Sequence, residues 1–191
     1  MAKKGNKKHL KRLATIKALG IPDKKKYKFI TKPSPGRHGK FSLPIIVFLR
    51  DKLNVAKTKK EVKYILNKGV VKVDNKVVKD FKYPIGLFDI IDVGNNKYLI
   101  ALDKKGRLTY KNVDKEVVKS DKLLKIKNKV AITTNKWQLT FHDSRTKIVD
   151  DKSFKIGDTV IIDLSTKEIK QVVKPEKNVK CLITQGKHAG K

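Results

Sequence analysis

His142, Asp143 and Ser144 have the residue types of a hydrolase triad, so they are the first candidates for chemistry. Consecutive residues of an extended chain point to opposite sides and cannot bring a nucleophile, a base and an orienting acid within hydrogen-bond reach. We therefore interpret this stretch as a turn between strands. The single cysteine, Cys181, lies in an apolar run that is typical of a small core residue rather than of a nucleophile.

The remaining side chains indicate no metal or cofactor site. One cysteine excludes an internal disulfide, and the four histidines do not show the spacing of a zinc site. Trp137 stands in an alternating strand pattern, which favours the core, with stacking on an unpaired base as the alternative. We expect no cofactor, no metal and no small-molecule substrate.

Lysine is the residue type whose abundance points to a partner. Lys and Arg number 48 against 18 acidic residues, which gives a formal charge of +30 and favours a polyanion nearby. Only five of the 48 are arginine, and lysine binds phosphates as a point charge better than it reads base edges. Apolar runs are as short as Ile45 to Leu49, so nucleic acid is favoured over a membrane. No apolar segment of signal-peptide length follows the basic N-terminus, so we expect a cytoplasmic protein.

Two predicted helices must position some of these lysines. The first helix is predicted to begin at Ser42. Ser42 is a favourable N-cap and Pro44 fits the first helical turn. A buried stripe at spacings of three and four supports this helix; its members are Ile45, Ile46, Phe48, Leu49 and Leu53.

The second helix is predicted to begin after Thr58, because Thr58 and Glu61 have the spacing of a capping box. Val62, Ile65 and Leu66 form its apolar stripe, and Gly69 fits the position just past its end. The following segments are a hairpin over residues 70–79 with the turn Asp74-Asn75, a turn at Tyr83 to Gly86, and a strand from Leu87 to Val93 that pairs with the hairpin.

This order of helix, helix and hairpin resembles the RNA-binding domain named after ribosomal small-subunit protein four. The second helix and the hairpin would place several lysines on one side of a small rigid unit, where RNA phosphates would meet them. The residues that carry the resemblance are Leu43-Pro44, Phe48-Leu49-Arg50-Asp51, Ala56-Lys57-Thr58, Glu61, Asn67-Lys68-Gly69, Val71-Lys72-Val73-Asp74 and Gly86-Leu87-Phe88-Asp89-Ile90-Ile91.

Residues 1–41 precede this module and carry 14 basic residues against one acid, Asp23. Apolar residues are sparse in this segment, so we expect an extended arm that orders only when a partner neutralises it. Lys7 to Ala14 and Lys32 to His38 are similar to the N-terminal segment of the archaeal and eukaryotic, or e-type, members of that ribosomal protein family. The stretch from Ile16 to Phe29 departs from the family in lacking a tryptophan.

After Val93 the pattern changes to short alternating strands, which predict a small barrel. The segment resembles the central domain of the e-type family through Leu139 to Thr146 and Val149 to Ser153. The predicted strands are Tyr98 to Leu102, Arg107 to Tyr110, Leu123 to Ile126, Val130 to Thr134, Trp137 to Phe141 and Thr159 to Asp163.

Residues Lys180 to Gly190 resemble the opening of a KOW motif, the glycine-rich entry to an SH3-like barrel. The sequence stops there, so a C-terminal barrel is expected to be truncated or absent, with loss in this lineage and a cut sequence as the two alternatives. The complete organisation is then α+β, with domains at 1–41 (basic arm), 42–93 (RNA-binding domain), 94–175 (mostly-β barrel-like domain) and 176–191 (start of a KOW segment).

An RNA-modifying enzyme and a free RNA-binding factor are the two alternatives to a ribosomal component. Some pseudouridine synthases carry a similar module, but their Gly-Arg-Leu-Asp motif is Gly106-Arg107-Leu108 followed by Thr109 here, so the catalytic acid is missing. A free accessory factor that binds stalled ribosomal subunits would not need the arm or the barrel-like domain.

The resemblance therefore implies a structural, non-enzymatic constituent of the small ribosomal subunit, located in the cytoplasm. Its expected partners are small-subunit ribosomal RNA (rRNA) and neighbouring small-subunit ribosomal proteins, with no membrane. His9 and His38 are expected to donate hydrogen bonds to phosphate rather than to act as acid or base. The residues expected to bind rRNA are Lys7, Lys8, His9, Lys11, Arg12, Arg37, His38, Arg50, Lys57, Lys59, Lys60, Lys63, Lys72 and Lys76.

Overall fold

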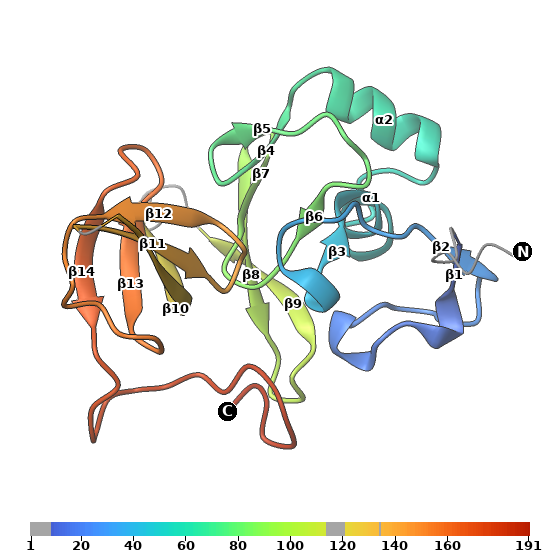
Figure 1. The fold of residues 1–191 in the computed structure, drawn as a ribbon. Coiled ribbons are helices and arrows are strands. Elements are labelled where there is room, and N and C mark those ends of the chain that lie inside the picture. The colour runs from blue at the N-terminus through green and yellow to red at the C-terminus, as the bar shows by residue number, and fades with distance from the viewer. Residues whose placement is uncertain (1–8, 114–120, 134) are drawn as a thin grey trace, which may run out of the picture.

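The computed structural model describes residues 9–113, 121–133 and 135–191, and this part of the chain is mostly β with two short α-helices. Two five-stranded antiparallel sheets lie beside each other, and the helices and the N-terminal segment lie on the far side of the first sheet (Figure 1). The first sheet consists, in spatial order, of β5 (Lys76–Val77), β4 (Val71–Val73), β7 (Ile90–Val93), β8 (Asn96–Leu102) and β9 (Leu108–Val113). The second consists of β12 (Thr146–Val149), β11 (Lys136–Phe141), β10 (Asp121–Thr133), β13 (Thr159–Asp163) and β14 (Ile169–Val173).

The first helix begins later than the sequence predicts. Leu43–Pro44 forms the short strand β3, which pairs with β6 (Pro84–Ile85), and α1 (Ile45–Val47) follows it directly. The hydroxyl of Ser42 donates to the carbonyl of Gly39 at 2.8 Å, so Ser42 is not the N-cap. A π-helical turn, Phe48–Lys52, continues α1. The predicted apolar stripe is nonetheless buried. Its residues Ile45, Ile46, Phe48 and Leu49 all lie in the hydrophobic core that the helices share with the first sheet, called the first core below.

The second helix and the hairpin match their predictions closely. The helix α2 (Lys59–Asn67) starts with a complete capping box: Glu61 donates its backbone N–H to the Thr58 hydroxyl at 3.3 Å, and the Glu61 carboxylate accepts from the Thr58 backbone N–H. Gly69 has a φ of +71° just past the helix. Both residues of the Asp74-Asn75 turn have positive φ, as a two-residue hairpin turn requires.

The predicted turn at Tyr83 to Gly86 is wrong, because Pro84–Ile85 is the strand β6. The expected strand from Leu87 to Val93 is confirmed only in its second half, since β7 begins at Ile90 and pairs there with β4 and β8. The first sheet then continues through β8 and β9, so the boundary expected after Val93 falls inside a sheet.

Residues 9–41 of the N-terminal segment are packed against the first sheet's domain, contrary to the prediction of an arm that orders only on a partner; residues 1–8 lie outside the described residues. The short strand β1 (Leu10–Lys11) pairs with β2 (Phe29–Ile30). Leu19, Ile21 and Ile30 are buried in the same hydrophobic core as residues of α1, α2 and the first sheet, which supply the apolar surface that the segment lacks by itself. Sparse apolar residues were therefore enough, because the segment shares a core rather than building one.

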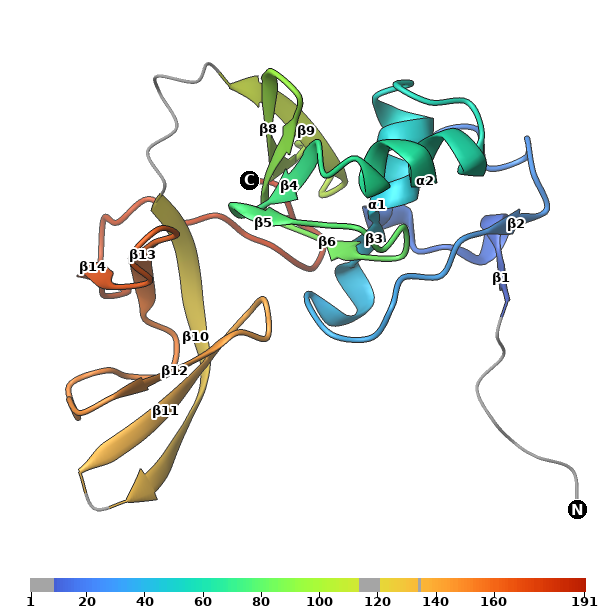
Figure 2. The same ribbon diagram turned by 90° about the horizontal axis from the view of Figure 1, so that it is seen from above.

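The second sheet confirms part of the predicted strand pattern. The strand predicted at Thr159 to Asp163 has those bounds, and Trp137 to Phe141 lies within β11. The two strands expected between Leu123 and Thr134 are one long strand, β10, of 13 residues, which pairs with β13 in its first half and with β11 in its second (Figure 2). Thr134 lies outside the described residues. No pairing joins the edge strands β12 and β14 in the described ranges, so this sheet is not a closed barrel there.

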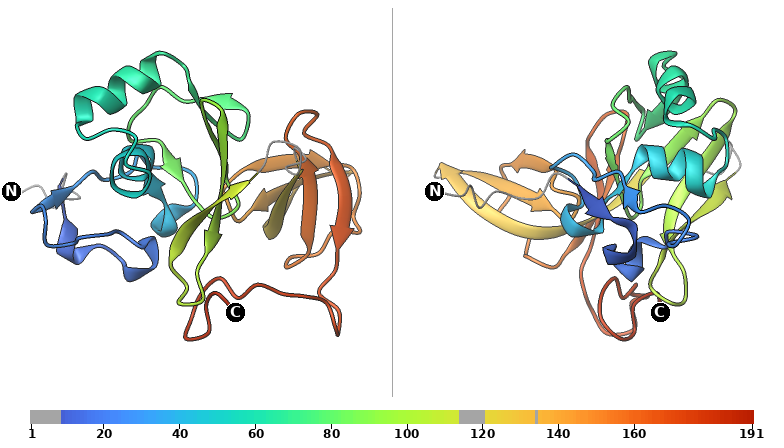
Figure 3. Two further views of the ribbon diagram at one scale, coloured as in Figure 1. Left: turned by 180° about the vertical axis from the view of Figure 1, so that it is seen from behind. Right: turned by 90° about the vertical axis from the view of Figure 1, so that its right-hand side faces the viewer.

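The C-terminal segment, residues 174–191, contains no strand and runs back beneath the turn between β8 and β9 (Figure 3). Ala189 and Gly190 pack against Gly106 and Asp103 of that turn so closely that a Cβ on either glycine would overlap its neighbour. Cys181 is exposed, so its expected core position is wrong. Across the described residues, no helix is long and apolar enough to cross a membrane.

Candidate nucleic-acid interface

The exposed face of α2 holds three of the predicted RNA-binding lysines. Lys59 and Lys63 are one helical turn apart, and both extend over the ring of Phe81, with Nζ at 4.3 and 5.2 Å from the ring centre. Lys60 is also exposed on this helix. The capping box fixes where the helix starts, so the three ammonium groups are presented by a rigid element.

The other predicted lysines of the module lie around this helix. Lys57 precedes α2, and Lys72 and Lys76 come from the hairpin; all three are exposed. The hairpin register pairs Lys72 with Val77 and Lys76 with Val73, and directly opposed residues share a face, so Lys72 and Lys76 point to opposite faces. The sequence alone did not show that the two lysines point to opposite faces of the hairpin, because this depends on which residues of the two strands pair.

Within the described residues, these lysines form no ion pair with a carboxylate. The nearby acid Glu61 is used by the helix cap, which lowers its pKa through hydrogen bonds from the Lys57 backbone and Thr58. Lys57 also lowers the pKa of Glu61 through its charge, and the positive charge of the other lysines is left for an external anion.

The N-terminal candidates divide into exposed and buried residues. His9 and Lys11 are exposed, whereas Lys7 and Lys8 lie outside the described residues. Arg50 is partly covered, because its guanidinium donates to Asp51 at 2.7 Å. That hydrogen bond raises the pKa of Arg50 against the opposing effect of burial.

Arg12, Arg37 and His38 are held inside the protein, so the structure does not offer them to RNA phosphates. Arg12 is 1% exposed and donates to Asp51 at 2.9 Å and to the carbonyl of Pro22 at 2.7 Å. Arg37 and His38 belong to a network of buried charges between the two sheets. We therefore exclude these three from the candidate surface.

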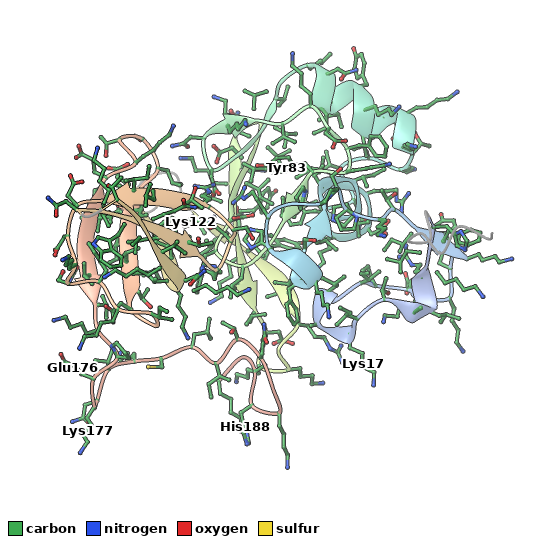
Figure 4. The ribbon with its side chains drawn as sticks, viewed as in Figure 1. Lys17, Tyr83, Lys122, Glu176, Lys177 and His188 are labelled. Atoms are coloured by element: carbon green, nitrogen blue, oxygen red, sulfur yellow. The ribbon has the colours of Figure 1, made fainter. Side chains whose placement is uncertain are left out.

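The buried network is centred on Lys122, whose side chain is fully buried near the start of β10. Its ammonium group contacts Asp74 at 2.8 Å, Asp143 at 3.6 Å, and Asp89. Figure 4 shows Lys122 at the junction of the second sheet with the rest of the chain. Since Asp74 and Asp89 come from the first sheet's domain and Asp143 from the β11–β12 turn, Lys122 joins the two sheets.

Two arginines and a histidine complete this network. Arg37 donates to Asp74 and to Asp89, each at 2.7 Å, and to the hydroxyl of Tyr83 at 3.0 Å. Arg145 pairs with Asp74 and, at 3.1 Å, with Asp143. The His38 ring nitrogen Nε2 lies 2.9 Å from Asp89. Three carboxylates thus face three full positive charges, which matches the pairing that buried charges require.

The pKa shifts show how strongly the network favours the charged forms. Burial alone would raise the pKa of Asp89, but Lys122, His38 and Arg37 lower it far below its usual value. Burial would likewise lower the pKa of Arg37, whereas Asp89 and Asp74 raise it. These groups stabilise the junction as ions and are not poised for proton transfer at neutral pH.

The triad-like residues take part in structure rather than in catalysis. They lie in the turn between β11 and β12, as predicted, with Ser144 exposed at a φ of +66°. The carboxylate of Asp143 forms ion pairs with Arg145 and Lys122. Burial lowers the pKa of His142, and its Nδ1 accepts a hydrogen bond from the backbone of Lys125 at 3.2 Å.

Trp137 is partly buried beneath a lysine. The Nζ of Lys129 lies 4.3 Å from the ring centre and also donates to the carbonyls of Lys152 and Phe154. The indole is therefore partly buried with an ammonium group over its ring, and it lies outside the fully buried core of the second sheet.

Sequence reasoning missed the network, although one signal was available. Lys122, Leu124 and Ile126 are all buried and alternate along β10 with exposed residues. Lys122 is two residues from Leu124, so its side chain points to the same buried side of the strand. A lysine buried in this way needs a carboxylate partner inside the protein, and the alternation therefore indicated a buried acid. Which acids meet it depends on how the sheets pack.

The comparisons with known proteins agree on one family. A model of the family described as "Ribosomal family S4e" matches residues 94–169. The small ribosomal subunit protein eS4 of Nanoarchaeum equitans is 40% identical over 188 residues, which cover 97% of this chain and 80% of the relative. That of Methanocaldococcus jannaschii is 38% identical, over 100% of this chain and 81% of the relative.

A solved structure supports the same assignment. The crystal structure of the 30S ribosomal protein S4e from Thermoplasma acidophilum superimposes with a TM-score of 0.69 and 34% identity, covering 78% of each chain. The sequence relatives and the shared fold are independent of the lysine surface described above. The chain belongs to the small ribosomal subunit protein eS4 family.

Proposed function

We propose that this chain is a structural constituent of the small ribosomal subunit that binds small-subunit rRNA through a lysine surface, without a reaction of its own. Family membership supports the place in the small subunit. The lysine surface consists of the exposed residues Lys57, Lys59, Lys60, Lys63, Lys72 and Lys76, to which His9 and Lys11 add a second, N-terminal contact. Lys7 and Lys8 remain proposed contacts on the sequence alone.

The observation that carries this proposal is the contrast between two sets of cations. Inside the protein, Lys122, Arg37 and Arg12 are each matched by a carboxylate. On α2, Lys59 and Lys63 have only the ring of Phe81 as a neighbouring partner among the described residues. A protein that pairs its interior charges and leaves these open is suited to an external polyanion.

The mechanism is electrostatic docking by a preorganised surface. Each ammonium group that meets a phosphate releases a condensed counterion, so affinity should fall steeply with salt. Lysine contacts of this kind position a protein on the backbone and do not read base sequence. Neighbouring small-subunit proteins are also proposed partners, because the relatives of this chain are proteins of the small ribosomal subunit.

Charge reversal on α2 tests the proposal. Lys59→Glu/Lys60→Glu/Lys63→Glu should weaken binding to transcribed small-subunit rRNA and reduce the slope of log affinity against log salt by roughly three, as measured by filter binding over a salt series. The control is Lys104→Glu/Lys105→Glu/Lys155→Glu, three exposed lysines elsewhere with the same change in net charge. Equal affinity of both triple variants would contradict the assigned docking surface.

The place in the ribosome has a separate test. The protein should sediment with small subunits in a gradient of cell lysate and be released only by concentrated salt. Sedimentation with the soluble fractions at low salt would contradict a structural role.

A further inference from the structure

Two exposed aromatic rings lie on the N-terminal segment and are not part of the lysine surface. Tyr27 is 51% exposed and Phe29 is 48% exposed, although both belong to a segment that otherwise contributes to the core. They are on or beside β2, at the opposite end of the protein from the second sheet (Figures 1 and 2). Aromatic side chains with an exposed face are suited to contact with a partner.

The pairing of β1 with β2 explains how Phe29 is presented. Phe29 is opposite Lys11 and Ile30 is opposite Leu10, so Ile30 faces the core and Phe29 faces outward with Lys11. The His9 ring meets Phe29 edge-on, with centroids 5.4 Å apart and an angle of 76° between the planes. Lys28 Nζ lies 5.5 Å from the Phe29 ring centre.

Tyr27 is surrounded by three cations, of which the exposed Lys26 has its Nζ 5.7 Å from the ring centre and the other two are fixed. The guanidinium carbons of Arg12 and Arg50 lie 5.8 and 5.9 Å from its ring centre. Both guanidinium groups donate to Asp51, whose side chain is only 7% exposed. The ring is therefore oriented by a buried ion-pair cluster, which lowers the entropy lost when a second planar group stacks on it.

The charge around the rings selects the chemistry of the occupant. Residues 9–32 contain eight lysine and arginine residues and one acid, Asp23. An apolar protein partner would have to bury this positive charge, whereas a nucleotide supplies a flat π-system for the ring and a phosphate for the adjacent cations. Cations near an aromatic face also stack favourably with bases.

We propose that Tyr27 and Phe29 form a stacking platform for unpaired bases of the small-subunit rRNA, with the flanking phosphates held by Lys11 and Lys28. The proposal rests on the proposed function and adds to it a site for single-stranded RNA. It differs from the lysine surface in kind, because the two rings carry no charge and require an unpaired base.

The test compares Tyr27→Ala/Phe29→Ala with Tyr27→Phe/Phe29→Trp, which keeps both π faces, and with Ile148→Ala, which removes an exposed apolar side chain on the second sheet. Binding is measured to the rRNA transcript and to a perfectly paired RNA duplex over a salt series. We expect the double alanine variant to bind the transcript about tenfold or more weakly, with an unchanged salt slope and unchanged duplex affinity. The aromatic variant and Ile148→Ala should bind like the unaltered protein.

The outcomes separate this inference from the proposed function. If the unaltered protein binds the transcript and the double alanine variant binds it equally well, stacking is refuted while the lysine surface stands. If the unaltered protein does not bind rRNA, the proposed function itself fails. Equal RNA affinity with loss of incorporation into subunits would assign the rings to a protein neighbour and refute stacking. Phe29→Ala alone, which leaves Tyr27 over its arginines, serves if the double variant does not fold.

Discussion

Replacing Lys122 by methionine should strongly destabilise the protein, because the side chain is fully buried among three carboxylates. Methionine keeps an unbranched chain of similar length, so the packing of β10 changes little and the charge is what is lost. Asp74, Asp89 and Asp143 would then face only two full positive charges, those of Arg37 and Arg145. One buried negative charge would remain unmatched.

The size of the effect follows from the cost of an unmatched buried charge. Removing one partner of a buried ion pair costs about 3–5 kcal/mol, most of it the penalty of the charge left behind. We expect a loss of that size in the free energy of unfolding at pH 7, measured by urea denaturation. Adding Asp143→Asn should restore part of the loss, because it removes a carboxylate that Lys122 contacted.

The pH dependence gives a second measure. Asp89 has a lowered pKa in the folded protein, so its contribution to stability is present above its unfolded pKa, near 3.9, and is lost as the pH falls through the folded value. Without Lys122, burial favours the protonated form of the Asp89 carboxyl, so lowering the pH costs the variant less stability than it costs the unaltered protein. The difference in the free energy of unfolding between the two proteins should therefore be largest at neutral pH and should shrink as the pH falls toward about 4.

Lys170→Met is the matched control for Lys122→Met. Lys170 also contacts two aspartates, Asp121 and, at 2.8 Å, Asp163, but its side chain is 46% exposed, so water can replace the lost partner. Its stability should be nearly unchanged. Our account of the network would be refuted if Lys122→Met lost less than about 1 kcal/mol at pH 7, or if both variants lost the same amount.

Three further predictions concern stability measured by denaturation. Thr58→Ala removes the cap of α2 and should cost about 1 kcal/mol, whereas Thr58→Ser should cost little; equal losses would contradict the cap's role. Gly86→Ala places a Cβ on the His38 ring and should lower the melting temperature, and His38→Ala should partly rescue it. Burial lowers the pKa of Lys52 to about 8, below its unfolded value of about 10.4, so the unfolded chain binds more protons between these values. The protein should therefore gain stability from this group as the pH rises from 8 to 10, and Lys52→Met should lack that gain.

The sequence was sufficient for two features that depend on residues a few positions apart. The capping box at Thr58 and the two-residue turn at Asp74-Asn75 are set by chemistry within a few residues, and both were predicted correctly. The burial of the stripe that includes Phe48 also follows from local spacing. The exposed lysines of α2 were found for the same reason.

Long-range packing set the limits of prediction. Ser42 failed as a cap because Leu43–Pro44 pairs with a strand some 40 residues away, which holds the backbone extended. Arg12 resembled any other basic residue of the N-terminal segment until its carboxylate, Asp51, was placed beside it. In a chain with so few acids, the position of each acid decides which cations stay inside, and only the fold reveals those positions.

The interior charge cluster has a consequence for the relative position of the two sheets. Arg37, Asp74 and Lys122 come from three distant parts of the sequence and meet at one point, so the two sheets are fastened together without RNA. The relative position of the two sheets is then set before any partner arrives. A partner that touched both sheets would have to match that fixed spacing, so the protein would select it by shape.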